Sequence, residues 1–466
     1  TISNFRFLNP GLPQVRNHVL RVIMDVVRRY KVDGIHMDDY FYPYPPNQIT
    51  NQDTATFRLN ARGFTDIGDW RRDNVNLLLR MLRDSLAAVN PGVKFGMSPF
   101  GIWRPGVPPG ITGLDAYATI YCDAIAWLQQ RSVDYYVPQL YWRIGGSQDF
   151  DRLQRWWADS VTANNRHFYP GMIYHATYTT SELPNQLRLN RANPKVHGSV
   201  YFRGNNIRDN TLGFADTLRR SFFRNPAFPT IMNWKDVVNP NPPRNLRFDR
   251  IPGRAIAGLQ WEVPLAASDH DTARFYGVYR IPTNTITPGV IDNSDHLIDI
   301  TGNKFDFPPN VSSAPTQTFF TVTALDENNN ESLPSNVVTV IAPATPVLVL
   351  PADNNNNIPP EITFSWRYAS PASAYRLTIA TTQDFSSGIF YDNGNLTDTS
   401  ITLTGFNGML TYFWRVSARN SSGISANSVV RSFTGGFPMA PTLVYPPNNT
   451  GNRSEEHTSE LQSRHN

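Results

Sequence analysis

Two patterns of hydrophobic and polar positions divide the chain near residue 236. Before this point, short apolar runs alternate with longer stretches in which apolar residues recur every three or four positions. Residues 15–30 and 73–89 show the longer pattern, and residues 32–39 and 94–98 show the short runs. Recurrence at i, i+3 and i+4 predicts an amphipathic helix, and a short apolar run between turn residues predicts a buried strand.

The same strand and helix unit recurs further along. It predicts helices over residues 120–131, 150–163, 183–192 and 210–220, and strands over residues 133–142, 168–174 and 198–202. Strands that alternate with helices of this length indicate a parallel sheet. Each predicted strand ends in polar or aromatic residues, as in a (β/α)8 barrel with its site at the carboxyl ends. A doubly wound sheet is the alternative, although no glycine-rich phosphate loop follows a strand.

From residue 237 onward the helical spacing disappears, and short alternating strands lie between segments rich in Pro, Asn, Ser and Thr. This pattern predicts β-sandwiches of the fibronectin type III kind over residues 237–342 and 343–438. A repeated Pro-rich motif predicts that a further module begins and is cut off over residues 439–452. Residues 453–466 resemble a translated sequencing adapter and are excluded from reasoning about the fold.

Charge and cysteine content narrow the class of protein. The 466 residues include 42 basic and 38 acidic side chains without a clustered basic stripe, which argues against a nucleic-acid partner. Cys122 is the one cysteine, and no apolar run is long enough to cross a bilayer. The chain begins at Thr1 without a leader, and we expect a signal peptide upstream and a secreted, periplasmic or cell-surface location.

The most informative motif is Asp33-Gly-Ile-His-Met-Asp-Asp-Tyr-Phe-Tyr-Pro-Tyr-Pro45. Because strand residues alternate between faces, His36, Asp38 and Tyr40 share one face of the predicted strand, and Asp39 belongs to the other. A carboxylate at the end of an apolar strand caps a helix, binds a loop or faces a site. Carboxylates followed by tyrosines favour a sugar-cleaving site, because aromatic rings stack on sugars while the charge faces a developing oxocarbenium ion.

Several motifs in chain order resemble the glycosyl-hydrolase-like family 10 proteins. They are Asn9 to Arg16, Tyr30 to Pro45, Phe95 to Trp103, Asp134 to Trp142 and Gly198 to Arg203. The resemblance implies a (β/α)8 barrel distantly akin to the alpha-amylase type, acting on bacterial cell-wall glycan such as peptide-free peptidoglycan strands. It also implies that the Asp38–Asp39 strand is the fourth of the barrel. The chain then carries strands four to eight, and strands one to three would precede Thr1.

The resemblance also assigns roles to residues. Asp38 and Asp39 become the catalytic candidates, and the substrate-binding candidates are His36, Tyr40, Ser98, Trp103, Gln139, Tyr141, Trp142, Tyr201 and Arg203. Hydrolysis uses two carboxyl groups, about 5–5.5 Å apart for retention and about 6.5–9.5 Å apart for inversion. No later strand end carries a Glu. The candidates for the second group are Asp39, Asp115, Asp123, Glu182 and a residue of the missing strands.

No metal or other cofactor is predicted. His36 and His175 stand at strand ends without paired metal-ligand spacing, so neutral site walls are the simpler interpretation. The acidic, Asn-rich segments 326–330 and 353–357 are explained by hairpin turns more simply than by calcium.

The leading hypothesis is therefore an O-glycosyl hydrolase of a bacterial polysaccharide, with Asp38 as nucleophile or base. The β-sandwiches would space the barrel from a surface or bind carbohydrate weakly. One alternative is a carbohydrate-binding cell-surface protein that has lost its acid. Another is an adhesion protein, which leaves the aromatic, carboxylate-bearing strand ends unexplained. The sequence leaves the oligomeric state open.

Overall fold

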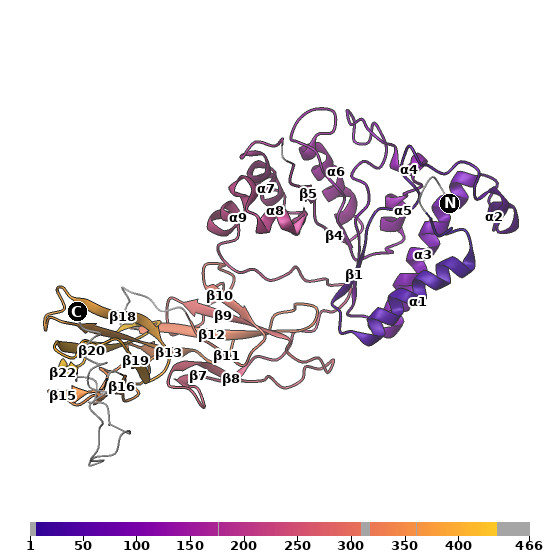
Figure 1. Ribbon diagram of the computed structural model, residues 1–466. Coiled ribbons are helices and arrows are strands. Elements are labelled where there is room, and N and C mark those ends of the chain that lie inside the picture. The colour runs from indigo at the N-terminus through magenta and orange to yellow at the C-terminus, as the bar shows by residue number, and fades with distance from the viewer. Residues whose placement is uncertain (1–5, 176, 309–316, 360, 436–466) are drawn as a thin grey trace, which may run out of the picture.

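A computed structural model describes residues 6–175, 177–308, 317–359 and 361–435, and Figure 1 shows an α/β domain followed by two β-rich domains in a row. The truncated module and the adapter-like tail predicted from residue 439 onward lie outside the described residues. Among the helices of the described ranges, none is long and apolar enough to cross a membrane.

The first domain is built on a parallel sheet whose strands follow one another in chain order. The strands are β1 (Gly34–Met37), β2 (Lys94–Met97), β3 (Tyr135–Tyr136), β4 (His167–Phe168), β5 (Gly171–Ile173) and β6 (Val200–Phe202). The first four pair in the order β1-β2-β3-β4, and β5 pairs with β6. Parallel bridges from Gln139 to Phe100 and Gly171 continue the sheet between the two groups. The predicted alternation of parallel strands and helices is therefore present.

The strands are shorter than the sequence pattern predicts. The run over residues 133–142 forms regular strand only at Tyr135–Tyr136, and Pro138 follows closely. Proline has no backbone N–H and cannot complete a ladder. Pro170 interrupts the next strand in the same way, which separates β4 from β5.

Helices cover one face of this sheet. They are α1 (Pro13–Arg29), α2 (Thr54–Leu59), α3 (Ile67–Val89), α4 (Ala116–Thr119), α5 (Ala124–Gln129), α6 (Phe150–Thr162), α7 (Glu182–Ala192), α8 (Gly204–Arg208), η1 (Thr211–Gly213), α9 (Phe214–Thr217) and η2 (Leu218–Phe222). Trp70, Trp127 and Trp157 are fully buried in or beside the core between the helices and the sheet.

Two predicted helices are broken in the structure. The stretch predicted over residues 120–131 is helical only at α5; Tyr121, whose φ of 53° is left-handed, separates α5 from α4, which precedes the predicted stretch. The stretch predicted over residues 210–220 is interrupted at Leu212 and Gly213, with φ of 52° and 69°. Left-handed backbone cannot continue a right-handed helix.

The second domain is a β-sandwich. Its strands are β7 (Arg244–Arg250), β8 (Ala257–Glu262), β9 (Phe275–Ile281), β10 (Leu297–Thr301), β11 (Phe305–Asp306), β12 (Gln317–Leu325) and β13 (Val338–Ile341). One sheet has the order β11-β8-β7 and the other β10-β9-β12-β13. Trp261 is buried in the core cluster that both sheets contribute to.

The third domain repeats this arrangement. Its strands are β14 (Leu348–Leu350), β15 (Asn355–Ile358), β16 (Ile362–Trp366), β17 (Ala374–Ala380), β18 (Ile389–Leu396), β19 (Ser400–Leu403), β20 (Thr411–Asn420), β21 (Gly423–Ile424) and β22 (Arg431–Gly435). The sheet β14-β16-β19 faces the sheet β15-β22-β20-β17-β18, and Trp366 is buried in their core.

A connecting segment, residues 224–238, joins the α/β domain to the first sandwich at the amino ends of the parallel strands. Asp134 directly precedes β3. It accepts a hydrogen bond from the Trp234 indole (2.8 Å) and forms an ion pair with Lys235 (3.0 Å). Lys94, at the start of β2, donates to the Glu327 carbonyl of the sandwich. The first sandwich is thus attached to the edge of the sheet opposite the strand ends that carry Asp38.

Candidate functional site

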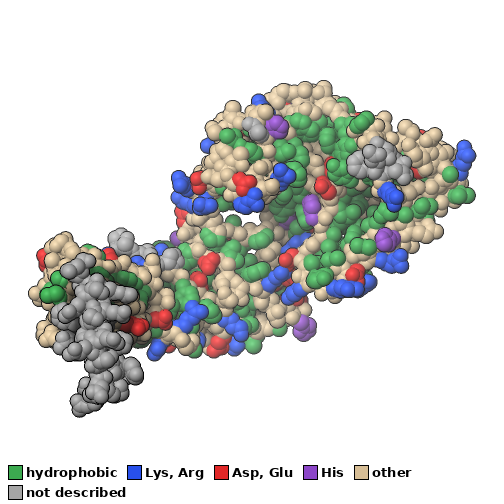
Figure 2. Space-filling view, viewed as in Figure 1, with side chains coloured by type: hydrophobic (Ala, Val, Ile, Leu, Met, Phe, Trp, Pro, Cys, Tyr) green, Lys and Arg blue, Asp and Glu red, His purple; other side chains and the backbone are tan. Residues whose placement is uncertain are grey.

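The face of the parallel sheet that helices leave uncovered, called here the open face, carries a row of three aligned residues. His36 on β1 pairs with Gly96 on β2, and Gly96 pairs with Tyr135 on β3. A Cβ on residue 96 would lie 2.0 Å from the Tyr135 ring, so glycine is required for this ring to lie across β2. Tyr135 thereby reaches His36: the rings stack at 5.6 Å and the Tyr135 hydroxyl lies 3.2 Å from Nδ1. Figure 2 shows this side of the domain hollowed and lined with hydrophobic groups.

Asp38 follows β1 on the same side as His36 and is exposed to solvent. Its Oδ1 accepts a hydrogen bond of 2.9 Å from the Gln139 amide, which extends from the segment after β3. The two bridges of Gln139 to neighbouring strands fix its backbone. Asp38 is therefore a solvated carboxylate whose orientation is set by a neighbouring strand.

Asp39 points the other way, as strand alternation predicts. It is 5% exposed and accepts a short hydrogen bond from the Tyr44 hydroxyl. Burial raises the pKa of Asp39, and the negative charge of nearby Asp38 raises it further, while the Tyr44 hydrogen bond opposes the rise. The two adjacent carboxyl groups therefore occupy different environments, which is how proteins separate acid and base roles.

Tyr141 and Phe202 form a wall beside the carboxylates. Their rings stack at 5.8 Å with an interplanar angle of 27°. Burial raises the pKa of Tyr141 to about 12, and the charges of Asp38 and Asp39 act in the same direction. Tyr141 is therefore a neutral phenol near both carboxylates. Desolvation lowers the pKa of His36, and the negative charge of Asp38 opposes this shift.

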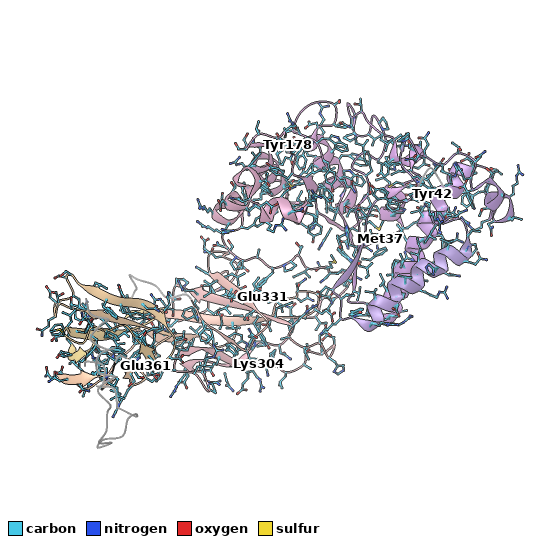
Figure 3. The ribbon with its side chains drawn as sticks, in the orientation of Figure 1. Met37, Tyr42, Tyr178, Lys304, Glu331 and Glu361 are labelled. Atoms are coloured by element: carbon cyan, nitrogen blue, oxygen red, sulfur yellow. The ribbon has the colours of Figure 1, made fainter. Side chains whose placement is uncertain are left out.

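The loop after β1 is held firmly, which fixes Tyr44 against Asp39. Figure 3 marks Met37 at the end of β1 and Tyr42 in this loop. Tyr42 is buried and accepts a hydrogen bond from Asn74 of α3. Later in the loop, Asp53 forms a buried ion pair with Arg71 of α3. A buried ion pair with further hydrogen bonds specifies one arrangement of the loop.

Several candidate residues lie away from Asp38 or are engaged elsewhere. The Ser98 hydroxyl donates to the Val137 carbonyl (2.7 Å) and is buried. Trp103 stacks on Trp156 of α6 at 6.2 Å. Tyr201 packs on Phe214 of α9, on the helix side of β6.

Three further candidates lie nearer the strand ends. Trp142 packs edge-to-face on Phe100. Tyr40 and Arg203 are exposed, and the Tyr40 ring contacts Tyr44. Sequence reasoning missed Phe100 and Phe202, and it included Tyr44 only as one of the tyrosines that follow the carboxylates. Tyr201 and Phe202 are adjacent on one strand, so only one of them can face the site. This alternation could have indicated that Phe202 was an alternative to Tyr201.

The other carboxylates proposed as partners of Asp38 have local structural roles. Asp115 caps α4 by accepting from the Ala118 N–H (2.9 Å), and Asp123 caps α5 by accepting from the Ala126 N–H (3.2 Å). Glu182 accepts from the Ile144 N–H (2.8 Å). Within the described ranges, Asp39 is therefore the carboxyl group with the clearest electrostatic link to Asp38.

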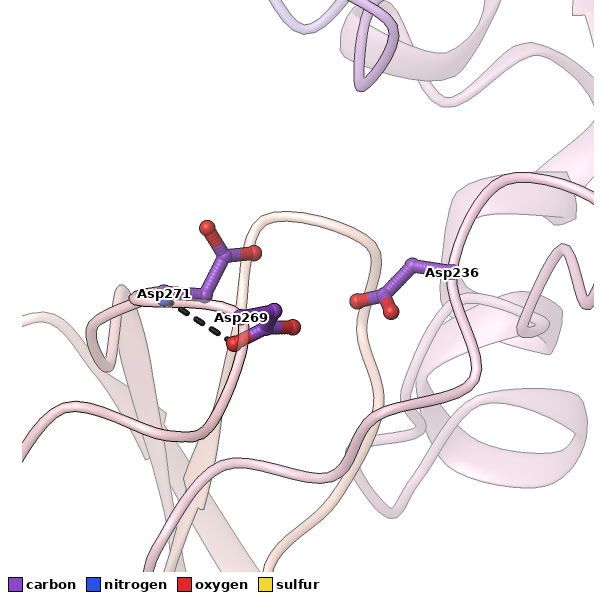
Figure 4. Close-up of side chains that lie close together, drawn as sticks. All are labelled: Asp236, Asp269 and Asp271. Atoms are coloured by element: carbon purple, nitrogen blue, oxygen red, sulfur yellow. Dashed lines mark hydrogen bonds between the residues drawn. The ribbon is translucent and has the colours of Figure 1, made fainter.

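One group of acidic side chains has spacing that a cation could bridge. The carboxylate oxygens of Asp236, Asp269 and Asp271 lie within 4.8 Å of one another. Figure 4 shows how the three side chains are arranged. They belong to the connecting segment and a loop of the first sandwich, far in the fold from Asp38. Asp236 accepts a hydrogen bond from Asn330, and Asp269 accepts one from the Asp271 N–H.

Sequence comparison places the α/β domain among known proteins. Residues 1–185 match the family described as Glycosyl hydrolase-like 10. Glycosyl hydrolase YngK of Bacillus subtilis is 32% identical over 293 residues, which are 60% of this chain and 57% of that protein. Glycosyl hydrolase DigH of Escherichia coli K12 is 35% identical over 220 residues, 43% of this chain and 50% of that protein. The chain thus spans about half the length of these curated relatives.

Solved structures match the chain only weakly. A Fn3-like protein from Clostridium thermocellum is 22% identical, with a TM-score of 0.16 over 22% of this chain and 96% of that chain. The FN1–FN3 domains of chicken CNTN1 are 16% identical, with a TM-score of 0.16 over 42% of this chain and 67% of that chain. Scores this low carry no argument about the fold. The family match covers residues 1–185, the part of the chain that carries most of the motifs described above, and it shows that this part is similar to the glycosyl hydrolase-like 10 family.

Proposed function

We propose that the α/β domain hydrolyses O-glycosidic bonds in a bacterial polysaccharide, with peptidoglycan glycan strands as the expected substrate. The observation that carries the proposal is the environment of Asp38. It is a solvated carboxylate on the open face, oriented by Gln139 and bordered by His36 and Tyr141. Relatives named glycosyl hydrolases support the reaction class.

In this proposal Asp38 acts as nucleophile or base at the sugar carbon. Burial and the neighbouring charge of Asp38 raise the pKa of Asp39, so Asp39 holds a proton more readily than an ordinary aspartic acid does. Asp38, the exposed member of the pair, would face the developing oxocarbenium ion. Tyr141 and Phe202 offer flat apolar surface beside that charge, on which a sugar ring stacks.

We further propose that the parallel sheet is strands four to eight of a (β/α)8 barrel and that both sandwiches are fibronectin type III-like. The chain-order pairing supports the barrel, as do the outer edges of β1 and β6, which pair with no other strand of the described residues, because a barrel closes by pairing such edges. Three-stranded and four-stranded sheets face each other in the first sandwich, which supports the module type. A glycan-directed enzyme of this kind would act in the periplasm, outside the cell or at its surface.

The test compares Asp38→Asn with Asp25→Asn in the natural full-length protein. Asp25 is an exposed residue of α1 and serves as the matched control. Peptide-free glycan strands are the substrate, and release of soluble sugars is measured. We expect Asp38→Asn to lower turnover about a thousandfold or more, because a lost catalytic carboxylate removes several kcal/mol of transition-state stabilisation. Near-normal turnover of Asp38→Asn would contradict the assignment.

A second candidate function is glycan binding without hydrolysis. The burial of Asp39 against Tyr44 favours it, because a buried carboxyl group is poorly placed to protonate a leaving group. Wild-type protein that binds glycan strands but releases no sugar, with Asp38→Asn binding equally well, would support this second function.

A further inference from the structure

We propose that the outer face of the larger sheet in the second sandwich binds an anionic polysaccharide through Arg415 and Arg419. The site is called here the arginine groove and consists of Arg376, Thr378, Phe385, Arg415, Ser417 and Arg419. This inference does not depend on the proposed hydrolytic function, because no residue of the groove belongs to the α/β domain.

Strand alternation places the arginines on one face. On β20, Trp414, Val416 and Ala418 are buried in the core, so Arg415, Ser417 and Arg419 point outward. On the adjacent strand β17, Arg376 is paired with Ser417 and Thr378 with Arg415. Three basic side chains therefore lie on two neighbouring strands of one sheet.

These side chains border a hollow and do not form a flat patch. The groove has a volume of about 480 Å³. Thr378 and Ser417 lie in its floor and are buried, so their hydroxyl groups are the polar atoms at the bottom. Phe385 and Ile424 line its sides.

The positive charge of the groove is only partly neutralised. Arg376 forms a two-point ion pair with Asp392 of β18. Arg419 donates to the Asn395 side chain, and the guanidinium of Arg415 lies 4.1 Å from the centre of the Phe385 ring. Among the ion pairs of the described ranges, none includes Arg415 or Arg419, so the groove keeps a net positive charge.

Two donors in the groove also lack partners. The Nε atoms of Arg415 and Arg419 are buried and make no hydrogen bond within the part of the chain that the structure describes. Guanidinium groups bind carboxylate and phosphate through paired N–H donors, and among the described residues neither guanidinium forms an ion pair with a carboxylate of the protein.

The spacing of the charges favours a polymer over a small anion. Arg415 and Arg419 are four residues apart on β20, which is about 14 Å along an antiparallel strand. Arg415 covers the Phe385 ring, and Arg419 donates to the Asn395 side chain on β18. Two positive charges at this backbone spacing suit a chain with repeating negative charges.

The surroundings favour a polysaccharide over a nucleic acid. Single-stranded nucleic acids bind through aromatic rings on which bases stack. The aromatic ring lining this groove, Phe385, already stacks with Arg415. The groove is lined instead by the hydroxyl groups of Ser417 and Thr378, and the Thr378 oxygen, which donates to Asp392, can still accept from a sugar hydroxyl.

The experiment measures binding of the full chain to polygalacturonate, to poly(glycerol phosphate), to neutral dextran and to single-stranded DNA, by titration calorimetry. The test variant is Arg415→Gln/Arg419→Gln. The matched control is Arg247→Gln/Arg367→Gln, which removes the same charge from exposed positions on the two sandwiches outside the groove. We expect binding to polygalacturonate and none to dextran. The test variant should lose about a hundredfold in affinity, since each lost charge-assisted contact is worth about tenfold, and the control should stay within about twofold.

The two anionic polymers separate a sugar chain that carries carboxylates from a phosphate polymer without sugars. Binding to polygalacturonate supports the proposal, and binding to poly(glycerol phosphate) alone would overturn it. A third variant, Arg415→Lys/Arg419→Lys, keeps the charge but not the paired donors, and we expect an intermediate loss. It also provides a test if the glutamine variant does not fold. Absence of binding to polygalacturonate, equal losses in test and control variants, or tighter binding to DNA would each overturn the proposal.

Discussion

At the scale of single residues, the candidate site depends on a glycine. Gly96 leaves the space through which Tyr135 crosses β2 and reaches His36. The sequence motif could place His36 and Asp38 on one face because strand alternation is a local property. It could not place Tyr135 or Gln139 beside them, because those contacts join residues 99 and 101 positions apart.

Replacing Gly96 by Ala should therefore disturb the site. The new Cβ overlaps the Tyr135 ring, and we expect a loss of about 1–3 kcal/mol in the free energy of unfolding, typical of overpacking. Gly204→Ala is the matched control, because nothing lies within 4 Å of its Cβ position. Urea unfolding measures both variants. Adding Tyr135→Ala to Gly96→Ala should recover much of the loss, and no recovery would show that the ring is not the obstacle.

The Asp39–Tyr44 pair gives a pH-dependent prediction. Because the pKa of Asp39 is raised in the folded protein, the stability it contributes is present below the unfolded pKa and is lost as pH rises through the folded pKa. The Tyr44 hydrogen bond opposes the rise, so Tyr44→Phe should move that loss to higher pH. Unfolding by urea across a pH series measures the shift. Tyr30→Phe, at an exposed tyrosine, should leave the pH profile unchanged.

At the scale of elements, the sequence predicted which segments are helices and strands better than where they end. Hydrophobic periodicity predicted the parallel strands and the long helices α1, α3 and α6, because burial of one face dominates those segments. It missed the breaks at Tyr121 and Leu212, which depend on left-handed backbone at non-glycine residues. It also did not determine which of Tyr201 and Phe202 faces the site, since both are large and aromatic.

Because Tyr201 and Phe202 lie on opposite faces of β6, replacing each of them by alanine should have a different effect. Tyr201 packs on Phe214 in the core, so Tyr201→Ala should lower the free energy of unfolding by about 3 kcal/mol. Phe202 is 52% exposed and stacks on Tyr141, so Phe202→Ala should change stability little but weaken glycan binding. Thermal unfolding and glycan pull-down distinguish the two. The reverse pattern would place Tyr201, and not Phe202, on the open face.

At the scale of the whole molecule, the connecting segment meets the α/β domain at a histidine pair, of which His167 is buried and His197 is half-buried. His167 and His197 stack at 4.1 Å, and His167 also contacts the Trp234 ring at 4.9 Å. Burial lowers the pKa of His167 to about 3, with the charges of His197, Arg166 and Lys94 acting in the same direction. The contact between the domains thus includes a histidine that stays neutral in the folded protein.

Acid should therefore loosen this contact. Below the unfolded histidine pKa of about 6.5, the unfolded chain gains a proton that folded His167 does not accept, so stability falls as pH falls toward 3. We expect His167→Gln to flatten this dependence by up to about 1.4 kcal/mol per pH unit. His18→Gln, at an exposed histidine of α1, is the control. Urea unfolding across a pH series measures the free energy of unfolding of each variant. If this free energy falls equally steeply with pH in wild type and in His167→Gln, the prediction is contradicted.

The first sandwich is attached at the amino ends of the parallel strands, which makes the two sides of the molecule different. The side of the carboxyl ends is called here the front. Asp38 lies at the carboxyl ends, so the described parts of the sandwiches leave the domain from the side opposite the carboxylates (Figure 1). A long polymer can then lie across the front without meeting the modules behind it. A ligand bound by the sandwiches would therefore lie on the side of the amino ends, and the carboxyl ends that carry Asp38 would stay accessible.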